Sequence, residues 1–231
     1  MIETVFVLMP AYNASATIEG VFARIPAEAR QRIRRYVVVN DGSKDDTAAA
    51  LDRLRKKVPG LVVLTHEVNR GYGEAEKTLL SYALKEGAGA GILLHSDGQY
   101  SPENILELLE PLDRDTADLV QGSRMLGGGA LRGGMPFYKF LANKALTAIE
   151  NRAFGMKLAE YHSGYMLYSR KTLETIPFEK LSNSFDFDLE GVDPLDQCGG
   201  AGRGRLQRAV SHLVGNTAVD LVAEPGEHRQ R

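Results

Sequence analysis

Cysteine is nearly absent from this chain of 231 residues, in which Cys198 is the only one. A single cysteine cannot form an intramolecular disulfide, and it cannot supply the paired thiolates of a structural zinc site. No histidine–cysteine signature surrounds Cys198, so we interpret it as an ordinary residue rather than a nucleophile. This cysteine usage fits a protein of a reducing compartment.

Long hydrophobic runs are also missing. No stretch of about 18 apolar residues occurs, so the sequence predicts no transmembrane helix. Residues 1–13 contain a short apolar run without a basic segment before it, which is not the pattern of a secretory signal peptide. With 43% hydrophobic and 25% charged residues, the composition is typical of a soluble globular protein with one well-buried domain.

The chain has no excess of positive charge and no glycine motif of the common phosphate-binding types. Its formal net charge is -2, whereas a general nucleic-acid binder is expected to be basic. No G-x-G-x-x-G follows the first predicted strand, and no P-loop occurs. A nucleotidyltransferase is disfavoured too, because the N-terminal region lacks a glycine-rich activating loop.

What the chain does contain is a regular alternation of strand and helix patterns. Short β-rich apolar runs predict strands at residues 4–9, 34–40, 61–65, 90–95, 117–121 and 163–169. Helical patterns lie between them at residues 15–29, 45–58, 73–85, from 101 onward, at 136–154 and at 171–176. This alternation predicts an α/β fold, with a mostly parallel sheet covered by helices on both sides.

Polar and glycine residues follow each of the first five predicted strands. The segments are P-A-Y-N (10–13), N-D-G-S (40–43), N-R-G-Y-G (69–73), H-S-D-G-Q-Y (95–100) and G-S-R (122–124). Ordinary turn chemistry would explain any one of them. In an open parallel sheet, however, ligands bind outside the carboxyl ends of the strands. Five such segments at one edge therefore indicate a ligand site.

The ordered set of these motifs, with N-D-G-S-x-D-D-T after the second strand, resembles glycosyltransferase family 2 over residues 4–190. Within the family it is similar to the dolichyl-phosphate mannosyltransferase-like and polyprenyl-phosphate sugar synthase-like branch. The resemblance implies the nucleotide-diphospho-sugar transferase (GT-A type) fold, a Rossmann-like, mostly parallel sheet. It also implies inverting sugar transfer from a nucleoside diphosphate sugar to an acceptor, foremost a polyprenyl (dolichyl) phosphate of the cell envelope.

The resemblance and the charge of such a donor suggest roles for the edge residues. Asp41 can accept a hydrogen bond from a base N–H, or it is a turn residue that caps the next helix. The residues expected to wall the base or contact the nucleotide are Pro10, Ala11, Tyr12, Asn13, Gly42, Ser43, Asn69, Gly71 and Ser96. Lys77 reaches a donor or acceptor phosphate in one interpretation and is an exposed helical lysine in the other.

A diphosphate leaving group calls for a hard divalent cation, Mg²⁺ or Mn²⁺, with oxygen ligands. Asp97 is the best ligand candidate, and the Gln99 amide oxygen lies on the same side in extended geometry. His95 stands where the resembled family commonly has a carboxylate. It binds the metal directly, contacts a phosphate, or orients Asp97, and imidazole suits softer metals better than Mg²⁺.

Three further charged residues receive roles from the resemblance. Arg124 would hold the diphosphate through its planar guanidinium. Arg132, in a glycine-rich loop, closes over the donor or is a solvated loop residue. Asp188 is the candidate general base among the acidic residues 186–190, which also fit a helix start. A polyprenyl phosphate acceptor is already an anion and needs no base, whereas a sugar hydroxyl would need one.

Residues 136–154 combine apolar residues at helical spacing with interleaved Lys139, Lys144 and Arg152. This pattern fits a helix that covers the core, which is the more frequent case. It also fits a membrane-surface helix, which a lipid-linked acceptor would favour. We expect a cytoplasmic protein, peripheral on the cytoplasmic membrane face if the second interpretation holds.

Residue usage changes abruptly after Glu190. The sequence predicts a catalytic domain at 1–190 and an anomalous tail at 191–231, ordered at most as a partial helix or strand. A frameshift, a truncation or a divergent terminus would account for it. Two alternatives to lipid-phosphate transfer therefore stay open. One is transfer to a sugar hydroxyl in surface polysaccharide synthesis, and the other is nucleotide-sugar binding without turnover.

Overall fold

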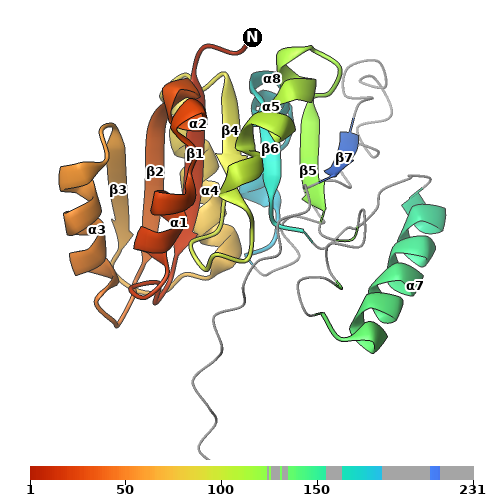
Figure 1. Ribbon diagram of the computed structural model, residues 1–231, viewed down its shortest axis with the longest axis horizontal. Coiled ribbons are helices and arrows are strands. Elements are labelled where there is room, and N and C mark those ends of the chain that lie inside the picture. Colours follow the sequence, from red (N-terminus) through yellow and green to blue (C-terminus); the bar gives the residue numbers. More distant parts are fainter. Residues whose placement is uncertain (124, 126–130, 132–134, 155–162, 184–208, 214–231) are drawn as a thin grey trace, which may run out of the picture.

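A computed structural model describes residues 1–123, 125, 131, 135–154, 163–183 and 209–213 of the chain. These residues form one sheet with helices on both of its faces (Figure 1). The expected α/β class is therefore confirmed.

The sheet has the strand order β3-β2-β1-β4-β6-β5-β7 in the described part of the chain. The strands are β1 (Val5–Ala11), β2 (Ile33–Asp41), β3 (Leu61–His66), β4 (Ala90–Leu93), β5 (Leu119–Ser123), β6 (Met166–Ser169) and β7 (Ala209–Leu213). Strand β6 runs antiparallel to β4 and β5, and the other pairs are parallel. All strands except β6 therefore end at the same edge, as predicted.

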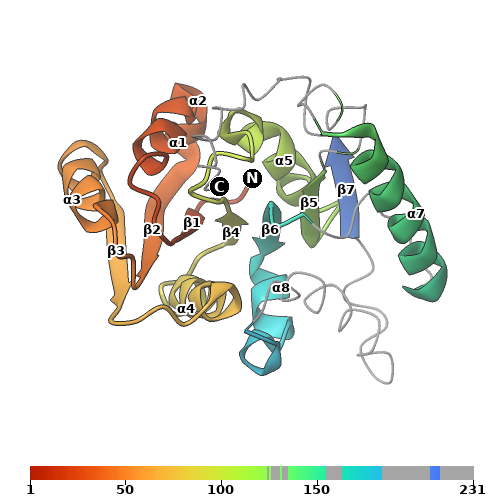
Figure 2. The ribbon, with the colours of Figure 1, turned by 90° about the horizontal axis from the view of Figure 1, so that it is seen from below.

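Helices cover the two faces of the sheet in separate groups (Figure 2). One face carries α1 (Ile18–Arg24), α2 (Ala27–Arg32), α3 (Thr47–Lys57), the short η1 (Pro102–Asn104) and α5 (Ile105–Asp113). The other carries α4 (Tyr72–Lys85), α8 (Arg170–Thr175) and η3 (Phe178–Lys180). The helix predicted at 15–29 is split at Pro26, because proline has no N–H to continue the α1 hydrogen-bond pattern.

Strand β1 lies at the centre of the core. Val5, Val7 and Met9 pack into the cluster under α1, α3 and α5, whereas Phe6 and Leu8 pack into the cluster under α4. Successive side chains of a strand point to opposite faces, so burial on both faces explains the uninterrupted apolar run in the sequence.

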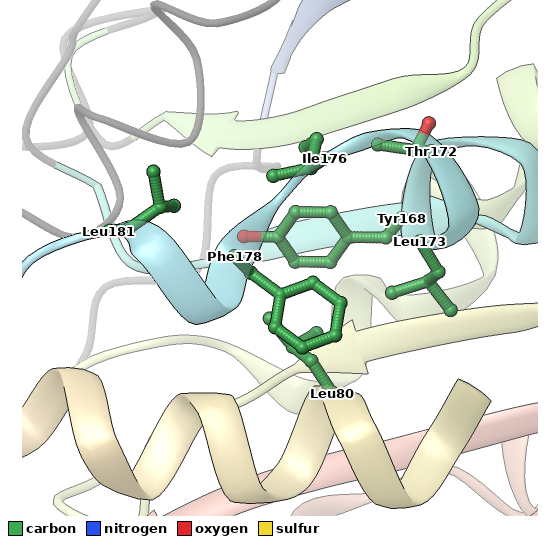
Figure 3. A pocket seen from close by; sticks show the side chains of 7 residues that line it. All are labelled: Leu80, Tyr168, Thr172, Leu173, Ile176, Phe178 and Leu181. Atoms are coloured by element: carbon green, nitrogen blue, oxygen red, sulfur yellow. The ribbon is translucent and has the colours of Figure 1, made fainter. Parts of the chain in front are cut away.

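A cavity of about 10 Å³ lies between α4 and α8, within the second of these clusters (Figure 3). Its lining consists of Leu80, Tyr168, Thr172, Leu173, Ile176, Phe178 and Leu181. Such a volume has room for about one water molecule, and its lining is largely apolar. We interpret it as a packing gap under α8 rather than a ligand site.

Helix α7 (Phe137–Phe154) stands apart from the helices that cover the sheet (Figure 1). The side chains of Phe137, Leu141 and Ile149 are 68%, 59% and 67% exposed, respectively. The more frequent interpretation of this segment, a helix that covers the core, is therefore wrong for these residues.

Strand β7 lies within residues 191–231, where the sequence allows a partial strand. It pairs in parallel with β5 at the edge of the sheet. Cys198 lies outside the described residues. The division of the chain at residue 190 stays a prediction.

Two leucines of α5 test the packing of the core. Leu108 is completely buried, whereas Leu106 is 36% exposed. Leu108→Ala should lower the free energy of unfolding by about 2–5 kcal/mol, because it removes buried methyl groups and leaves a cavity. Leu106→Ala should cost less than about 1 kcal/mol. Urea denaturation measures both values, and equal losses would contradict the assignment of the α5 face.

Candidate functional site

The loops after β1 and β2 are joined by hydrogen bonds between the motifs that follow them. The Asn13 backbone N–H donates to Ser43 Oγ at 3.0 Å, and the Lys44 N–H donates to Asn13 Oδ1 at 2.9 Å. Asn13 has a φ of 50°, a conformation that asparagine tolerates better than most residues. Asn13 and Ser43 therefore shape this edge by binding each other's loops.

Asp45 fixes the start of α3 to the same loops. Its carboxylate accepts hydrogen bonds from the backbone N–H groups of Ser15 at 3.1 Å and Thr47 at 3.0 Å. Desolvation alone would raise the pKa of Asp45, but hydrogen bonds from Ser15 and Thr47 outweigh it and lower the pKa to about 2. Asp45, the second aspartate of the N-D-G-S-x-D motif, is thus a carboxylate with a structural role in this chain.

Asp41 lies at the end of β2 and is only 3% exposed. Its Oδ1 contacts His66 Nδ1 at 2.6 Å and accepts the Arg70 N–H at 2.9 Å. Its Oδ2 accepts the Gly71 N–H at 3.0 Å. The turn interpretation is therefore correct in part, but the turn that Asp41 holds is the one after β3, not the start of α3.

The same turn packs closely on the glycine after Asp41. Gly42 has a φ of 65°, and a Cβ at this position would lie 2.3 Å from the Asn69 backbone nitrogen. Asn69 Oδ1 accepts the Gly71 N–H at 3.0 Å, as a turn asparagine commonly does. Gly42, Asn69 and Gly71 are thus brought together with Asp41, as the motifs predict.

His66 is the residue of this cluster that the sequence analysis missed. It is 7% exposed and ends β3, where the strand register pairs it with Asp41. Two polar residues at the ends of adjacent buried strands were the available signal. A lone histidine after an apolar run carries little information by itself.

The base-site wall predicted at residues 10–12 is only partly open. Tyr12 is 46% exposed, whereas Ala11 is 1% exposed and belongs to the core. Ser96 is 6% exposed, and its Oγ donates to the Pro10 carbonyl at 2.8 Å. Ala11 could therefore meet a base mainly through its backbone, and its place in the wall stays a prediction. Ser96 joins the ends of β1 and β4.

His95 lies in an aromatic cluster at the end of β4. Its Nε2 shares a hydrogen bond with the Tyr72 hydroxyl at 2.9 Å. The ring of Tyr100 meets it edge-on, with 5.0 Å between centroids. Gly164 packs against His95 and Tyr72, because a Cβ at this position would lie 2.5 Å from His95 Nε2 and 2.8 Å from the Tyr72 oxygen. These contacts fix the position of the His95 ring at the end of β4.

Asp97 and Gln99 are both exposed beyond β4. Asp97 Oδ1 accepts the Gln99 backbone N–H at 2.9 Å, which holds the carboxylate close to its own turn. Across the described ranges, no group of three histidine, cysteine or acidic residues is placed to hold a metal ion. His95, Asp97 and Gln99 thus follow one strand end without forming a preformed metal cage.

Lys77, on α4, is hydrogen-bonded to residues that follow η3. Its Nζ donates to the Leu181 carbonyl at 2.6 Å and to Asn183 Oδ1 at 2.5 Å. The Gly73 N–H adds a bond to the Asn183 carbonyl at 3.2 Å. The ammonium group therefore anchors residues 181–183 to the start of α4, and its contact with a phosphate stays a prediction.

Several predicted site residues lie outside the described part of the chain. They are Arg124, Arg132 and Asp188, with Asp186 and Glu190. Ser163 precedes β6, and its Oγ donates to the Gly122 carbonyl at 2.5 Å. Burial raises the pKa of the Tyr165 hydroxyl, which donates to the Ser101 carbonyl at 3.2 Å.

The mostly parallel sheet and the polar loops at its carboxyl edge place the chain among α/β proteins, in which ligands generally bind outside the carboxyl ends of the strands. Residues 6–176 match the family model described as "Glycosyl transferase family 2". The chain belongs to this family of glycosyltransferases, as the motifs predict.

Two similar curated proteins act on lipid-linked acceptors by name. The polyprenol monophosphomannose synthase of Mycolicibacterium smegmatis is 28% identical over 197 residues, which cover 85% of this chain and 69% of that protein. The UDP-N-acetylglucosamine–dolichyl-phosphate N-acetylglucosaminyltransferase of Methanococcus voltae is 26% identical over 186 residues, which cover 75% of this chain and 72% of that protein.

A solved structure shares the fold. It is glucosyl-3-phosphoglycerate synthase from Mycobacterium tuberculosis, in complex with Mn²⁺, UDP and glucosyl-3-phosphoglycerate. The TM-score is 0.63 at 22% identity, with 92% of this chain and 71% of that chain covered. This likeness confirms the predicted transferase fold.

Gly164 tests the cluster around His95. Gly164→Ala should lower the free energy of unfolding by about 1–3 kcal/mol, because the new methyl group overlaps the His95–Tyr72 pair. Gly20→Ala is the control, since nothing lies within 4 Å of its Cβ position in α1. Gly20→Ala should instead raise the free energy of unfolding by about 0.5–1 kcal/mol, because alanine is more stable than glycine within a helix. Urea denaturation distinguishes the two, and a neutral Gly164→Ala would contradict the described packing.

Proposed function

We propose that this glycosyltransferase moves a sugar from a nucleoside diphosphate sugar to a polyprenyl phosphate, with a divalent cation as cofactor. The observation that carries the proposal is the arrangement of two aspartates on either side of β1. Asp41 ends β2 and Asp97 follows β4, and these two strands flank β1 in the sheet. A nucleoside diphosphate laid across the end of β1 would meet both carboxylates.

The base would lie on the Asp41 side of this edge. A carboxylate there accepts a base N–H, and the exposed ring of Tyr12 offers a surface for the base. The loops that carry Asn13 and Ser43 are already joined by hydrogen bonds, and Asp41 binds the turn that carries Asn69. Such preorganisation lowers the entropy lost when a ligand binds.

The diphosphate and the cation would lie on the Asp97 side. Within the described part of the chain, Asp97 Oδ2 accepts no hydrogen bond, and the residue is exposed. Mg²⁺ commonly takes one or two carboxylates and completes its octahedron with substrate phosphates and water. Asp97 fits that requirement, with the Gln99 amide oxygen as a second candidate. The cation would neutralise charge that develops on the leaving diphosphate.

His95 supports the cation site indirectly. Its Nε2 is engaged by the Tyr72 hydroxyl, so we assign it the orienting role among the three alternatives. Arg124 and Arg132 are proposed for the diphosphate on the basis of the motif resemblance. Asp188 is not required as a base if the acceptor is a phosphate, because a phosphate oxygen is already an anion.

The acceptor is inferred from the names of relatives. Besides the two proteins above, the undecaprenyl-phosphate mannosyltransferase of Micrococcus luteus is 26% identical over 187 residues, which cover 80% of this chain and 75% of that protein. The names of all three relatives give a polyprenol or dolichyl phosphate product or acceptor, whereas the sugar is mannose in two of them and N-acetylglucosamine in the third. This supports the acceptor class more strongly than any particular sugar.

A membrane-embedded acceptor gives α7 a role at the bilayer surface. Its exposed apolar residues gather on one side of a helical wheel, and they include Phe137, Tyr138, Leu141 and Ile149. The buried Thr147 and the half-buried Asn143 lie on the opposite side. Phe140 is half-buried as well, but most of the large apolar side chains described in α7 are exposed, unlike those of a helix that covers a core.

The charges of α7 fit an anionic lipid surface. Lys139, Lys144 and Arg152 are exposed along the helix, and the acidic Glu150 is half-buried. None of the described helices is long and apolar enough to cross a membrane. We therefore propose that α7 lies in the plane of the bilayer surface, with its apolar side among the acyl chains and its cations near the head groups.

A transfer assay tests the proposed reaction. The chain is incubated with UDP- and GDP-linked sugars, Mn²⁺ and polyprenyl phosphate, and labelled sugar is measured in the organic phase. Asp97→Asn should lower the rate at least about 100-fold, because cation-assisted stabilisation of the leaving group is lost. Asp52→Asn, at an exposed aspartate of α3, should retain the wild-type rate. Absence of lipid-linked product with every donor would refute the proposal.

Vesicle co-sedimentation tests the role of α7. The wild type should sediment with vesicles rich in phosphatidylglycerol and much less with neutral phosphatidylcholine vesicles. Leu141→Ser combined with Ile149→Ser should weaken binding about tenfold or more, because two inserted apolar side chains are lost. Leu106→Ser, on α5, is the matched control. Equal binding of the double variant and the wild type would argue against insertion of α7.

A further inference from the structure

The hydrogen bonds of Asp41 are distributed unequally between its two oxygens. Oδ1 is contacted by His66 Nδ1 at 2.6 Å and by the Arg70 N–H at 2.9 Å. Oδ2 accepts only the Gly71 N–H, at 3.0 Å, among the bonds described. An ionised carboxylate offers about four lone-pair sites, two on each oxygen. Oδ1 is therefore fully used, and Oδ2 retains one site.

His66 is held in place to make this contact. Its Nε2 lies 3.0 Å from Thr78 Oγ1, which also lies 3.0 Å from the Glu74 carbonyl oxygen in α4. Arg70 and Gly71 contribute backbone N–H groups that any residue would supply at those positions. His66 is thus the side chain that distinguishes the two oxygens of Asp41.

The nucleobases differ in what they present to such a carboxylate. Guanine offers two adjacent donors, its ring N1–H and its amino group, which pair with both oxygens of a carboxylate at once. Uracil offers a single imide N–H between two carbonyl oxygens. A carboxylate with one remaining lone-pair site satisfies the single donor of uracil but leaves one of the two guanine donors unpaired.

We infer that His66 makes Asp41 a one-point acceptor and thereby selects a uridine diphosphate sugar over a guanosine diphosphate sugar. This inference rests on the proposed function, because it requires that the base binds at Asp41. Burial sharpens the selection, since Asp41 is 3% exposed and water has little access to a donor left unpaired there. Sites built on hydrogen bonds discriminate strongly against a ligand that leaves a buried polar group unpaired.

Isothermal titration of the full chain with UDP and with GDP, each in the presence of Mn²⁺, tests the inference. UDP should bind with a Kd at least about tenfold lower than that of GDP. An equal or lower Kd for GDP would overturn the selection by His66 while leaving the proposed transferase function intact. No binding of either nucleotide would overturn both.

Variants at His66 separate selection from general loosening of the site. His66→Leu removes the side chain that contacts Asp41 Oδ1. The preference for UDP, expressed as the Kd of GDP divided by the Kd of UDP, should fall by about tenfold in this variant. His66→Asn keeps an N–H donor at that end of the side chain and should preserve the ratio. Thr78→Val is the matched control, because it removes the partner of Nε2 and leaves the Nδ1 contact in place.

The ratio is the informative quantity, because loss of local order weakens both nucleotides together. A His66→Leu variant with the wild-type ratio would overturn the inference. If His66→Leu does not fold, the ratio of the two Kd values in the wild type and in His66→Asn still tests the inference. A wild type without a preference for UDP would overturn it. If Thr78→Val changes the ratio of the two Kd values as much as His66→Leu does, the selection depends on packing against helix α4. That result would overturn the assignment to the contact between His66 and Asp41.

Discussion

Backbone N–H groups at the carboxyl edge of the sheet need partners, and side chains of neighbouring loops supply them. Asp41 takes two such groups from the turn after β3, and Asp45 takes two more from the loop after β1 and the start of α3. Buried polar groups left unpaired would cost about 1–3 kcal/mol each. The loops of three adjacent strands are therefore fixed as one surface before any ligand arrives.

Because of this constraint, the two aspartates proposed to contact the donor differ in burial and in hydrogen bonding. Asp41 is buried and hydrogen-bonded by protein on both oxygens, so it offers a fixed and limited acceptor. Asp97 is exposed and bonded through one oxygen, so it can accept a hydrated cation. The first property suits recognition of a base, and the second suits a charge that arrives with the substrate. Between these two aspartates, His95 packs against Tyr72 and Gly164 just after β4.

The strand and helix order follows from the sequence because apolar runs and their spacing are local properties. The edge motifs were recognisable for the same reason, since each follows a strand directly. Partners distant in sequence were not predictable: His66 meets Asp41 through strand register, and Lys77 bonds to Leu181 and Asn183 more than a hundred residues away. The orientation of α7 was ambiguous because an apolar helical stripe has the same pattern whether it faces a core or a bilayer. Arg124, Arg132 and Asp188 retain only the roles that the motif resemblance implies.

The central claim is that the donor lies across the end of β1, with its base at Asp41 and its diphosphate at Asp97. A crystal structure of the full chain with UDP and Mn²⁺ tests it most directly. The account predicts a single base N–H within about 2.6–3.2 Å of Asp41 Oδ2. It also predicts a cation bridging Asp97 and the diphosphate. A nucleotide bound away from these two carboxylates, or a cation held without Asp97, would contradict it.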